Sequence, residues 1–562
     1  MGNNQLPGRN SGPDSTQQLM DDIRGKKLTR RELLHRAAAL GLGLPALMHV
    51  MAACVASPAA PAADAPAAAP ASSGPVAGGT SVWAAESDPV SLNPITNSNF
   101  ASTQAFEHSY ESLTAYDSQL NIIPSLAESW ETPDDLTYIF HLREGVKWHD
   151  GSDFTAADVK YTFDIVLDPE GPAVWRSNFD QVDTVEIVDD YTVTFTTKAP
   201  FPPLLGAFAI LRSSAIIKQG ALEEGNLDNT VVGTGPYILK QYIPQDVLEY
   251  EKFPDYWDAP LPYIENISFK ILVDEDTRIA ALRAGTVDYA FLTSVGAERV
   301  REDESITLLQ GPRTFLYVFV FNMERSPWSD VRVREAISLA TDRDELIQKA
   351  LFGSGSVSGP IPAGFGDWAL PEEELREKWY TNDIEKAKEL LAEAGIEEGQ
   401  VLDLLVTDFG GSPFYTGAGV VFKDQMAKIG IDVQIRLVEQ GVFIAEASPD
   451  GGFNYDMCIN AYSPRHDPDG FLWARFFSEN AYAVGYKNER MDELLPAARS
   501  TIDVAERHEL YNEAQAILLD ESPMIWVSVD NLTEGISPRL KGYEQSPFTR
   551  RSWSLARSWL EG

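Results

Sequence analysis

Residues 124–159, which read PSLAESWETPDDLTYIFHLREGVKWHDGSDFTAADV, decide the fold of this chain. From 136 to 142, large apolar residues alternate with other residues, which predicts a half-buried strand. The pair at 150–151, Asp-Gly, predicts a turn, because both residues suit the backbone geometry of tight turns. Thr155 and Asp158 have the spacing of a capping box at the start of a helix. The stretch therefore predicts a strand, a turn and a helix in succession.

Strand and helix patterns are mixed throughout the rest of the chain. Apolar residues alternate again at 191–195, as they do in a strand with one buried face. They recur at helical spacing at 333–340, with Ser329 as the candidate N-terminal cap. The same spacing appears at 387–394 and is closed by Gly395. These patterns predict a mixed α/β protein.

The chain has 562 residues and is strongly acidic, with a formal net charge of −39. Hydrophobic residues make up 44% of it, which at this length predicts a large core and more than one lobe. So acidic a surface repels nucleic acid and anionic lipid head groups, so we exclude nucleic acid as a partner. A solvated acidic surface explains the charge and need not select a cationic ligand.

The first residues of the chain have the features of an export signal. Arg30-Arg31 precedes an apolar run at 37–50, which is short for a membrane span. The arginine pair resembles a twin-arginine signal, and Ala-Ala-Cys at 52–54 resembles a bacterial lipobox. We therefore predict an export signal at 1–53 and lipid modification of Cys54.

Ala and Pro fill most positions of the segment that follows, up to residue 79. Such a segment cannot offset its own ordering entropy, so we expect an extended linker. Residues 54–79, the lipidated cysteine and its linker, would anchor the globular part to a membrane outside the cytoplasm, in the periplasm or at the outer face of the cytoplasmic membrane. An ordinary cleaved signal with a chance cysteine and an uncleaved anchor are the alternatives. Both the twin-arginine and the general secretory route stay open.

The reactive motifs of enzymes are missing. Neither a G-x-S-x-G elbow nor a P-loop occurs, and Gly-Thr-Gly at 233–235 lacks the third glycine of a dinucleotide loop. The zinc motif H-E-x-x-H fails at 508–512, where Asn512 replaces the second histidine. The turn at 467–470 lacks the ligand spacing of a calcium loop. Cys458 lies in an apolar stretch and is predicted to be a buried strand residue. We predict no catalytic residue, no metal and no cofactor.

Five segments, in the same order, resemble one family. They are Ser91–Pro94 with Tyr110–Leu113, residues 124–159, Gly233–Tyr237 with Asp255–Trp257, Val331–Ala336 with Asp342-Arg343, and Lys386–Gly395. Together they are similar to the extracytoplasmic solute-binding proteins of family 5, the dipeptide-, oligopeptide- and nickel-binding proteins that serve ABC importers. Many of these positions also have structural explanations, and Gly233 to Pro236 is expected to let two backbone segments approach closely.

The resemblance implies an α/β, two-lobe fold of the periplasmic-binding-protein type, type II and large peptide-binding subclass. Lobe I is expected at 80–312 and 527–562, with an inserted subdomain at about 112–230. Lobe II is expected at 313–526. The chain would cross between the lobes at these two boundaries, and the lobes would close on ligand by a hinge motion.

The resemblance also points to two ligand-binding loops. In the peptide-binding members a lobe I loop touches ligand, and it corresponds here to Ser98, Asn99 and Phe100. A lobe II loop carries an aspartate that pairs with the amino terminus of the peptide, and the matching position here is Pro464. Asp467 is a candidate substitute, although it can equally belong to the following turn.

Arg465 stands next to the missing acidic anchor. Because arginine presents a planar fork of donors, we predict that Arg465 faces the cleft and pairs with an anionic group of the ligand. The alternative is that it points outward or pairs internally with Asp467 or Asp469. Tyr462 and Trp526 are expected near the cleft, where they would stack on sugars or peptide side chains. Packing within a lobe is an equal alternative for both aromatic residues.

These features favour a binding protein for an ABC importer, with a peptide or peptide-like solute as ligand and the permease subunits as partners. Within the same family, binding of an oligosaccharide or another anionic solute is the alternative. A surface-anchored hydrolase and a tethered sensor or chaperone are alternatives of other classes. We expect a monomer that is attached to the membrane through its lipid anchor.

Overall fold

The structure, a computed structural model, describes residues 74–97, 99–408, 413–463, 465, 467–480, 482, 484–548 and 551–561. The export signal predicted at 1–53, the lipidation site Cys54 and linker residues 55–73 lie outside the described residues. Ser98 and Pro464 lie outside them as well.

One hydrophobic core draws its buried side chains from two separated parts of the chain, Trp83 to Tyr289 and Ile536 to Leu555. We refer to the elements around this core, together with β11, β12 and the helices beside them, as lobe I. They are β1 (Thr80–Ala85), α4 (Phe100–Phe106), β2 (Thr114–Tyr116), β3 (Ile122–Pro124), β4 (Ala127–Asp134), β5 (Thr137–Leu142), α5 (Ala156–Leu167), η1 (Arg176–Phe179), β6 (Val182–Asp189), β7 (Thr192–Thr197), α6 (Pro203–Phe208), α7 (Leu211–Ser214), β8 (Tyr237–Ile243), β9 (Val247–Lys252), β10 (Asn266–Ile271), α8 (Glu275–Arg283), β11 (Tyr289–Leu292), α9 (Ser294–Val300), β12 (Thr307–Pro312), β19 (Leu540–Lys541), α19 (Arg551–Arg557) and β20 (Trp559–Leu560).

A second hydrophobic core is built entirely from residues between Leu316 and Val529. We refer to the elements around it as lobe II. They are β13 (Leu316–Phe321), α10 (Val331–Ala340), α11 (Arg343–Ala350), β14 (Gly355–Val357), η2 (Ala363–Trp368), α12 (Glu372–Lys378), α13 (Ile384–Glu393), β15 (Gln400–Thr407), α14 (Pro413–Ala427), β16 (Ile431–Val438), α15 (Gln440–Glu446), β17 (Met457–Tyr462), α16 (Asp469–Phe476), α17 (Glu489–Ser500), α18 (Val504–Glu521) and the first half of β18 (Met524–Ile536).

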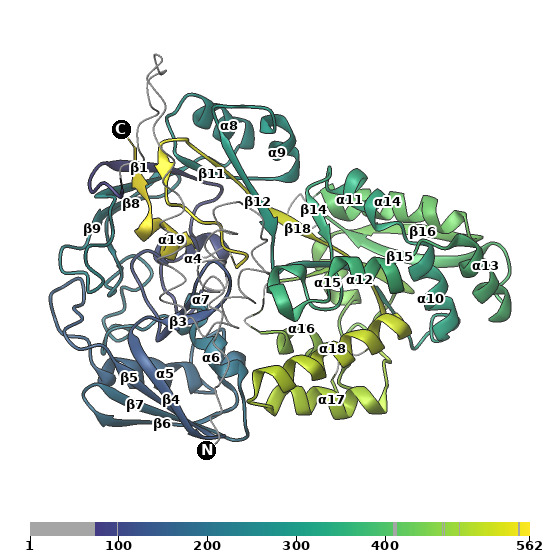
Figure 1. The fold of residues 1–562 in the computed structure, drawn as a ribbon, viewed down its shortest axis with the longest axis horizontal. Helices are drawn as coiled ribbons and strands as arrows, with labels where there is room; N and C mark the ends of the chain where they lie inside the picture. Colours follow the sequence, from purple (N-terminus) through teal and green to yellow (C-terminus); the bar gives the residue numbers. More distant parts are fainter. Residues whose placement is uncertain are drawn as a thin grey trace, which may run out of the picture. The chain divides into compact units, whose positions relative to one another are not determined.

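Strand β18 belongs to both lobes. Its first residues pair with β13 of lobe II, up to Ser528 opposite Tyr317. Its later residues pair with β12 of lobe I, from Asn531 opposite Pro312 onward. Figure 1 shows β12 and β18 running together between the two groups of elements. The two connections between the lobes are therefore adjacent antiparallel segments, and the exact lobe boundaries stay a prediction.

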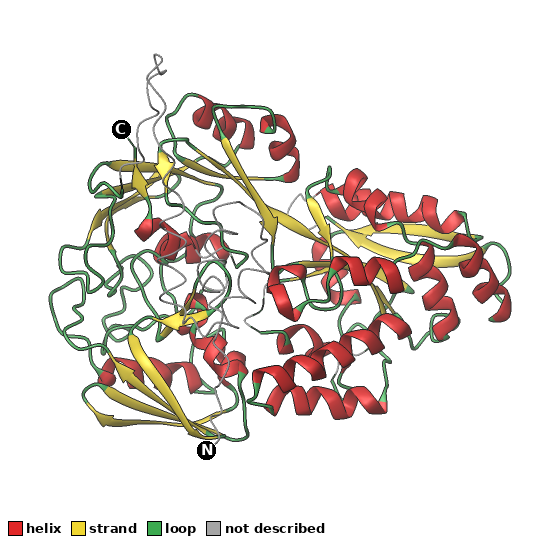
Figure 2. Ribbon diagram, in the orientation of Figure 1, coloured by secondary structure: helices red, strands yellow, loops and turns green. Residues whose placement is uncertain are grey.

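The described strands form one 12-stranded mixed sheet and three smaller sheets. The main order is β16-β15-β17-β13-β18-β11-β1-β10-β9-β8, with β12 and β14 also paired to β18. A separate four-stranded antiparallel sheet has the order β4-β5-β7-β6, and Figure 2 shows α5 beside it. Two two-stranded sheets, β2-β3 and β19-β20, complete the set. The predicted mixed α/β class is confirmed.

Most of the local predictions are confirmed, with two corrections at the ends of elements. β5 alternates between buried and half-buried residues as expected, but it begins at Thr137, and Leu136 before it is exposed. Helix α10 is capped by Asp330 and not by Ser329, because the Asp330 carboxylate accepts a hydrogen bond from the second backbone N–H of the helix. Helix α13 ends beside Gly395, whose φ of 73° favours glycine.

The glycines at 233 and 235 allow the close backbone approach that the sequence predicted. A Cβ atom on Gly233 would lie 1.8 Å from the carbonyl oxygen of Ser109, and one on Gly235 would lie 2.8 Å from the same oxygen. The backbone N–H of Gly235 donates to that oxygen at 2.8 Å. This segment therefore fixes the loop that follows α4. Residues of α4 line one of the cavities described below.

Candidate functional site

Two adjoining cavities have walls from both lobes. The larger has a volume of about 580 Å³ and is lined by Trp130 of lobe I and Arg465 of lobe II, among others. The smaller has a volume of about 320 Å³ and includes Phe100. Tyr116 and Phe548 line both cavities, so the two form one region. Concave sites between lobes are preferred places for small-molecule binding, which makes this region the candidate ligand site.

The predicted lobe I loop reaches this region through Phe100. Asn99 is the N-cap of α4, and its side-chain oxygen accepts a hydrogen bond from the backbone N–H of Ala101 at 2.8 Å. Phe100, which is 42% exposed, lines the smaller cavity. The cap therefore orients the helix that presents Phe100, while Ser98 lies outside the described residues.

Arg465 lines the larger cavity from lobe II. The buried Nε atom of Arg465 has no hydrogen-bond partner among the described residues. Burial, together with the positive charges of Arg475 and Arg212, lowers the pKa of Arg465 to about 10. The internal pairs with Asp467 or Asp469 that the sequence left open do not form, because each of these carboxylates lies against another arginine.

Asp467 is held in a buried ion pair with Arg507 of α18. Arg507 donates to the two carboxylate oxygens of Asp467 at 2.5 and 3.0 Å, and the same carboxylate accepts from the backbone N–H of Asp469 at 2.8 Å. Burial alone would lower the pKa of Arg507, but the charge of Asp467 raises it above its usual range. Asp467 thus braces the turn before α16 and is already engaged by a cation.

Asp469 and Arg499 form a second pair where lobe II meets lobe I. The Arg499 Nε atom lies 3.3 Å from a carboxylate oxygen of Asp469. Burial raises the pKa of Asp469 to about 7, although the charge of Arg499 opposes this shift. The Arg499 guanidinium also lies over the ring of Trp473 at 4.4 Å and over the ring of Phe201, a lobe I residue, at 5.1 Å. This arginine therefore joins the lobes through an aromatic contact.

The two aromatic residues predicted near the cleft lie in the lobe II core. Tyr462 is 8% exposed and donates its hydroxyl to the sulfur of Met524 at 3.4 Å. Trp526 is 2% exposed, and its carbonyl oxygen accepts a hydrogen bond from Nε of Arg343 at 2.8 Å. Neither residue is among the described residues that line the two cavities. Ligand contact by these residues stays a prediction, whereas their packing role is visible.

Sequence reasoning missed two arginines of the smaller cavity. Arg313 at the lobe connection lines it and donates to Asp530 through Nε at 3.0 Å. Arg212 of α7 lines it from lobe I, with its guanidinium 4.3 Å from the ring of Trp175. Arg212 interrupts the apolar run FAILRSSAII at 208–217. A charged residue in such a run is a signal that could have been used, because arginine is rarely placed among buried residues without a purpose.

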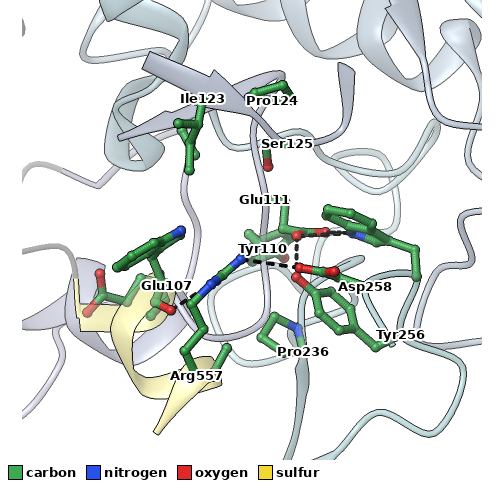
Figure 3. A pocket seen from close by; sticks show the side chains of 15 residues that line it. Glu107, Tyr110, Glu111, Ile123, Pro124, Ser125, Pro236, Tyr256, Asp258 and Arg557 are labelled. Atoms are coloured by element: carbon green, nitrogen blue, oxygen red, sulfur yellow. Dashed lines mark hydrogen bonds and ion pairs between the residues drawn. The ribbon is translucent and has the colours of Figure 1, made fainter. Parts of the chain in front are cut away.

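A third pocket lies within lobe I and is shown in Figure 3. Its volume is only about 50 Å³. The carboxylate of Glu111 accepts hydrogen bonds from Tyr256 at 2.9 Å and from Trp257 at 3.0 Å. It also accepts one from Thr234 at 2.9 Å. Arg557 points into the pocket and pairs with Asp258. Because this carboxylate already accepts bonds from several donors, it joins the loops that carry them. We therefore assign it a role in holding lobe I together and not in binding a ligand.

The described residues contain no cluster of three His, Cys, Asp or Glu side chains that could hold a metal ion. Cys458 is buried on β17, as predicted, and burial raises the pKa of its thiol to about 12. A thiol with so high a pKa is not a nucleophile at neutral pH. In the described part of the chain, the helices are too short or too polar to cross a membrane.

Known proteins resemble this chain over most of its length. The dipeptide-binding protein of Escherichia coli K12 is 30% identical over 508 residues, which cover 83% of this chain and 92% of that protein. The solved structure of HbpA2 from Haemophilus parasuis has a TM-score of 0.78 at 26% identity, and the match covers 86% of this chain and all of that one.

A further solved structure is that of the ABC transporter-associated periplasmic binding protein DppA from Helicobacter pylori in complex with the peptide STSA. Its TM-score is 0.69 at 25% identity, with 87% of this chain and 99% of that chain covered. The two-lobe fold predicted from the sequence is confirmed by these structures. Residues 121–483 match the family described as bacterial extracellular solute-binding proteins, family 5 Middle. The chain belongs to the bacterial extracellular solute-binding proteins of family 5.

Proposed function

We propose that this protein captures a peptide or peptide-like solute by closing its two lobes around it and delivers the solute to the permease of an ABC transporter. The observation that carries the proposal is the pair of adjoining cavities with walls from both lobes. Peptides are also the ligands named for DppA of Helicobacter pylori and for the dipeptide-binding protein. Binding would proceed without chemical conversion of the solute.

The antiparallel segments β12 and β18 support closure as the mechanism, because they are the adjacent connections between the two cores. Short adjacent connections let two lobes rotate as rigid bodies about a hinge. Oligosaccharide or another anionic solute is the alternative ligand within the same mechanism. Arg465, whose Nε has no hydrogen-bond partner among the described residues, favours the anionic alternative over a neutral sugar.

Mass spectrometry of the solutes released when the purified protein is denatured tests this function. We expect a small solute, chemically unchanged when it is supplied again, that lowers the radius of gyration in X-ray scattering. It should also raise the melting temperature, because a ligand that binds only the folded state stabilises it by mass action. Steady product formation that persists after the protein is purified again would favour a hydrolase. A scattering curve that is unchanged at saturating solute would contradict closure.

The lipid anchor and the extracytoplasmic location belong to the same proposal, and their support is the lipobox-like sequence before Cys54. Cys54→Ser is expected to move the protein from the membrane fraction to the soluble extracytoplasmic fraction, or to leave an uncleaved precursor, because the acylated thiol is lost. Fractionation and intact mass of both proteins measure this. Equal membrane retention and equal processing in the variant would refute the anchor.

A further inference from the structure

Three arginines gather around the part of the candidate site where lobe II faces lobe I. Arg465 lines the larger cavity and Arg212 lines the adjoining smaller one. Arg475 of α16 is not among the described residues that line these cavities, and its guanidinium carbon lies 3.5 Å from the ring centre of Tyr462. Burial and, after it, the positive charges of Arg475 and Arg212 lower the pKa of Arg465, so each of these two arginines lies within electrostatic reach of Arg465.

Glu107 lines the smaller cavity, and Asp367 and Asp467 line the larger one, but none of these described carboxylates forms an ion pair with Arg465 or Arg475. Asp467 is bonded to Arg507 and Asp469 lies against Arg499. Among the described residues, no carboxylate comes within ion-pair distance of Arg465 or Arg475, and Arg465 Nε and Arg475 Nη1 are buried without a hydrogen-bond partner. Burying an N–H donor of a charged group without a partner costs folding free energy. Such unpaired donors therefore point to a functional role, such as binding a ligand.

Gly470 sets the direction of Arg465. A Cβ atom on Gly470 would lie 2.9 Å from both Cβ and Cγ of Arg465 and 3.2 Å from its Cδ. The arginine stem therefore lies directly against the first turn of α16, and any larger residue at 470 would have to displace it. This contact aims the guanidinium at the cavity.

We propose that Arg465 and Arg475 of lobe II and Arg212 of lobe I form an anion subsite, in which a carboxylate or phosphate group of the solute bridges the two lobes. This inference rests on the proposed function and narrows it to solutes that carry an anionic oxygen group. Arginine suits the task, because its planar fork binds carboxylate and phosphate oxygens in pairs.

The subsite also couples binding to closure. In the empty protein, closure brings the charge of Arg212 toward those of Arg465 and Arg475, and like charges repel most where water is excluded. An anion between them replaces this repulsion by attraction from both sides. Lobe closure is therefore expected to be unfavourable without the anionic group and favourable with it.

The first experiment uses inorganic phosphate and acetate as probes on the intact exported protein. At constant ionic strength, replacing chloride by phosphate or acetate should raise the melting temperature of wild type by roughly 1–3 °C, as expected for a ligand at about ten times its Kd. The stronger of the two anions identifies the subsite as phosphate- or carboxylate-selective. Arg465→Gln should lose at least half of the rise, while Arg376→Gln, which removes an exposed arginine of α12 that pairs with Glu372 and with Asp344 of α11, should keep it.

Two further readouts separate a binding role from a structural one. Gly470→Ala keeps every charge, but its Cβ displaces the stem of Arg465, so the response to the anions should fall. Because the displaced atoms are close to the backbone, some loss of stability is expected as well, and the two proteins are compared at a temperature where both are folded. Without any added anion, Arg465→Gln should be more compact than wild type in X-ray scattering, because one of the repelling charges is gone. A purely structural arginine would give the opposite change, a looser protein.

The solute identified by mass spectrometry gives the decisive measurement. It should carry a carboxylate or phosphate, and Arg465→Ala should weaken its binding about 10- to 100-fold, the range for a lost hydrogen bond to a charged group. Arg465→Lys should restore only part of the affinity. Equal affinities in wild type and Arg465→Ala, or equal anion responses in wild type and Arg465→Gln, overturn the subsite. A neutral solute that still closes the lobes overturns it too, yet leaves the proposed function standing.

Discussion

Replacing Asp467 with Ala is expected to lower the free energy of unfolding by about 3–5 kcal/mol, because it leaves the Arg507 guanidinium buried without its carboxylate. The two side chains are only 11% and 6% exposed, and two hydrogen bonds join them. The bond of Arg507 to the carbonyl of Ala498 does not neutralise its charge. The midpoint of urea unfolding, followed by tryptophan fluorescence with an unchanged slope, measures the loss.

A matched control is Glu372→Ala, which breaks the exposed pair of Glu372 and Arg376 on α12. An exposed pair four residues apart on a helix contributes at most about 0.5 kcal/mol, so this variant should stay near wild type. Replacing both partners of the buried pair, Asp467→Leu with Arg507→Met, should recover most of the loss, because no buried charge is left alone. A single Asp467→Ala variant as stable as Glu372→Ala would show that the buried pair does not brace lobe II.

Trp526→Ala is expected to cost about 3–5 kcal/mol of folding stability, the range for removing a large aromatic side chain from a packed core. Trp526 is 2% exposed on β18, in register with Val318 and near the ring of Phe476. Trp526→Phe should cost much less, because it keeps most of the buried apolar volume. Thermal and urea unfolding of the three proteins measure the series.

A measurement of ligand affinity distinguishes a packing role of Trp526 from direct contact with the ligand. At a temperature where the variant is folded, Trp526→Ala should bind the identified solute as wild type does, because its ring does not line the cavities. Phe100→Ala provides the opposite pattern: Phe100 is 42% exposed and lines the smaller cavity, so affinity should fall with little change in stability. A Trp526→Ala protein of normal stability and weak binding would instead assign the ring to the ligand.

Local structure could be predicted closely where interactions between residues near in sequence determine it. The strand at 137–142 follows from the alternation of residues, and helix α13 follows from its apolar spacing and Gly395. The close approach at Gly233 follows from glycine's missing side chain. The cap of α10 was misplaced by one residue, since Ser329 and Asp330 are both good caps and only the backbone path selects between them.

The candidate site could be predicted only in part. Arg465 and Phe100 do line the cavities, and they were found through the positions of two loops in the chain. Arg212 was missed, because it comes from lobe I and lines a cavity next to that of Arg465 only once both lobes have folded. For Trp526 the sequence left ligand contact and lobe packing as equal alternatives, since an aromatic residue at a lobe boundary has the same sequence appearance whether it faces a ligand or a core.

The sequence by itself determined the α/β class through its periodicity and turn residues, because these are local along the chain. Its ordered motifs carried the family resemblance, and that resemblance implied the two-lobe fold. Only the tertiary structure decided which charges meet. Asp467 could have paired with Arg465, two residues away, yet it is bonded to Arg507, forty residues farther on. Ion pairs depend on distances of a few ångströms across the folded chain, and outside a helical turn the separation of two residues along the sequence does not fix such distances.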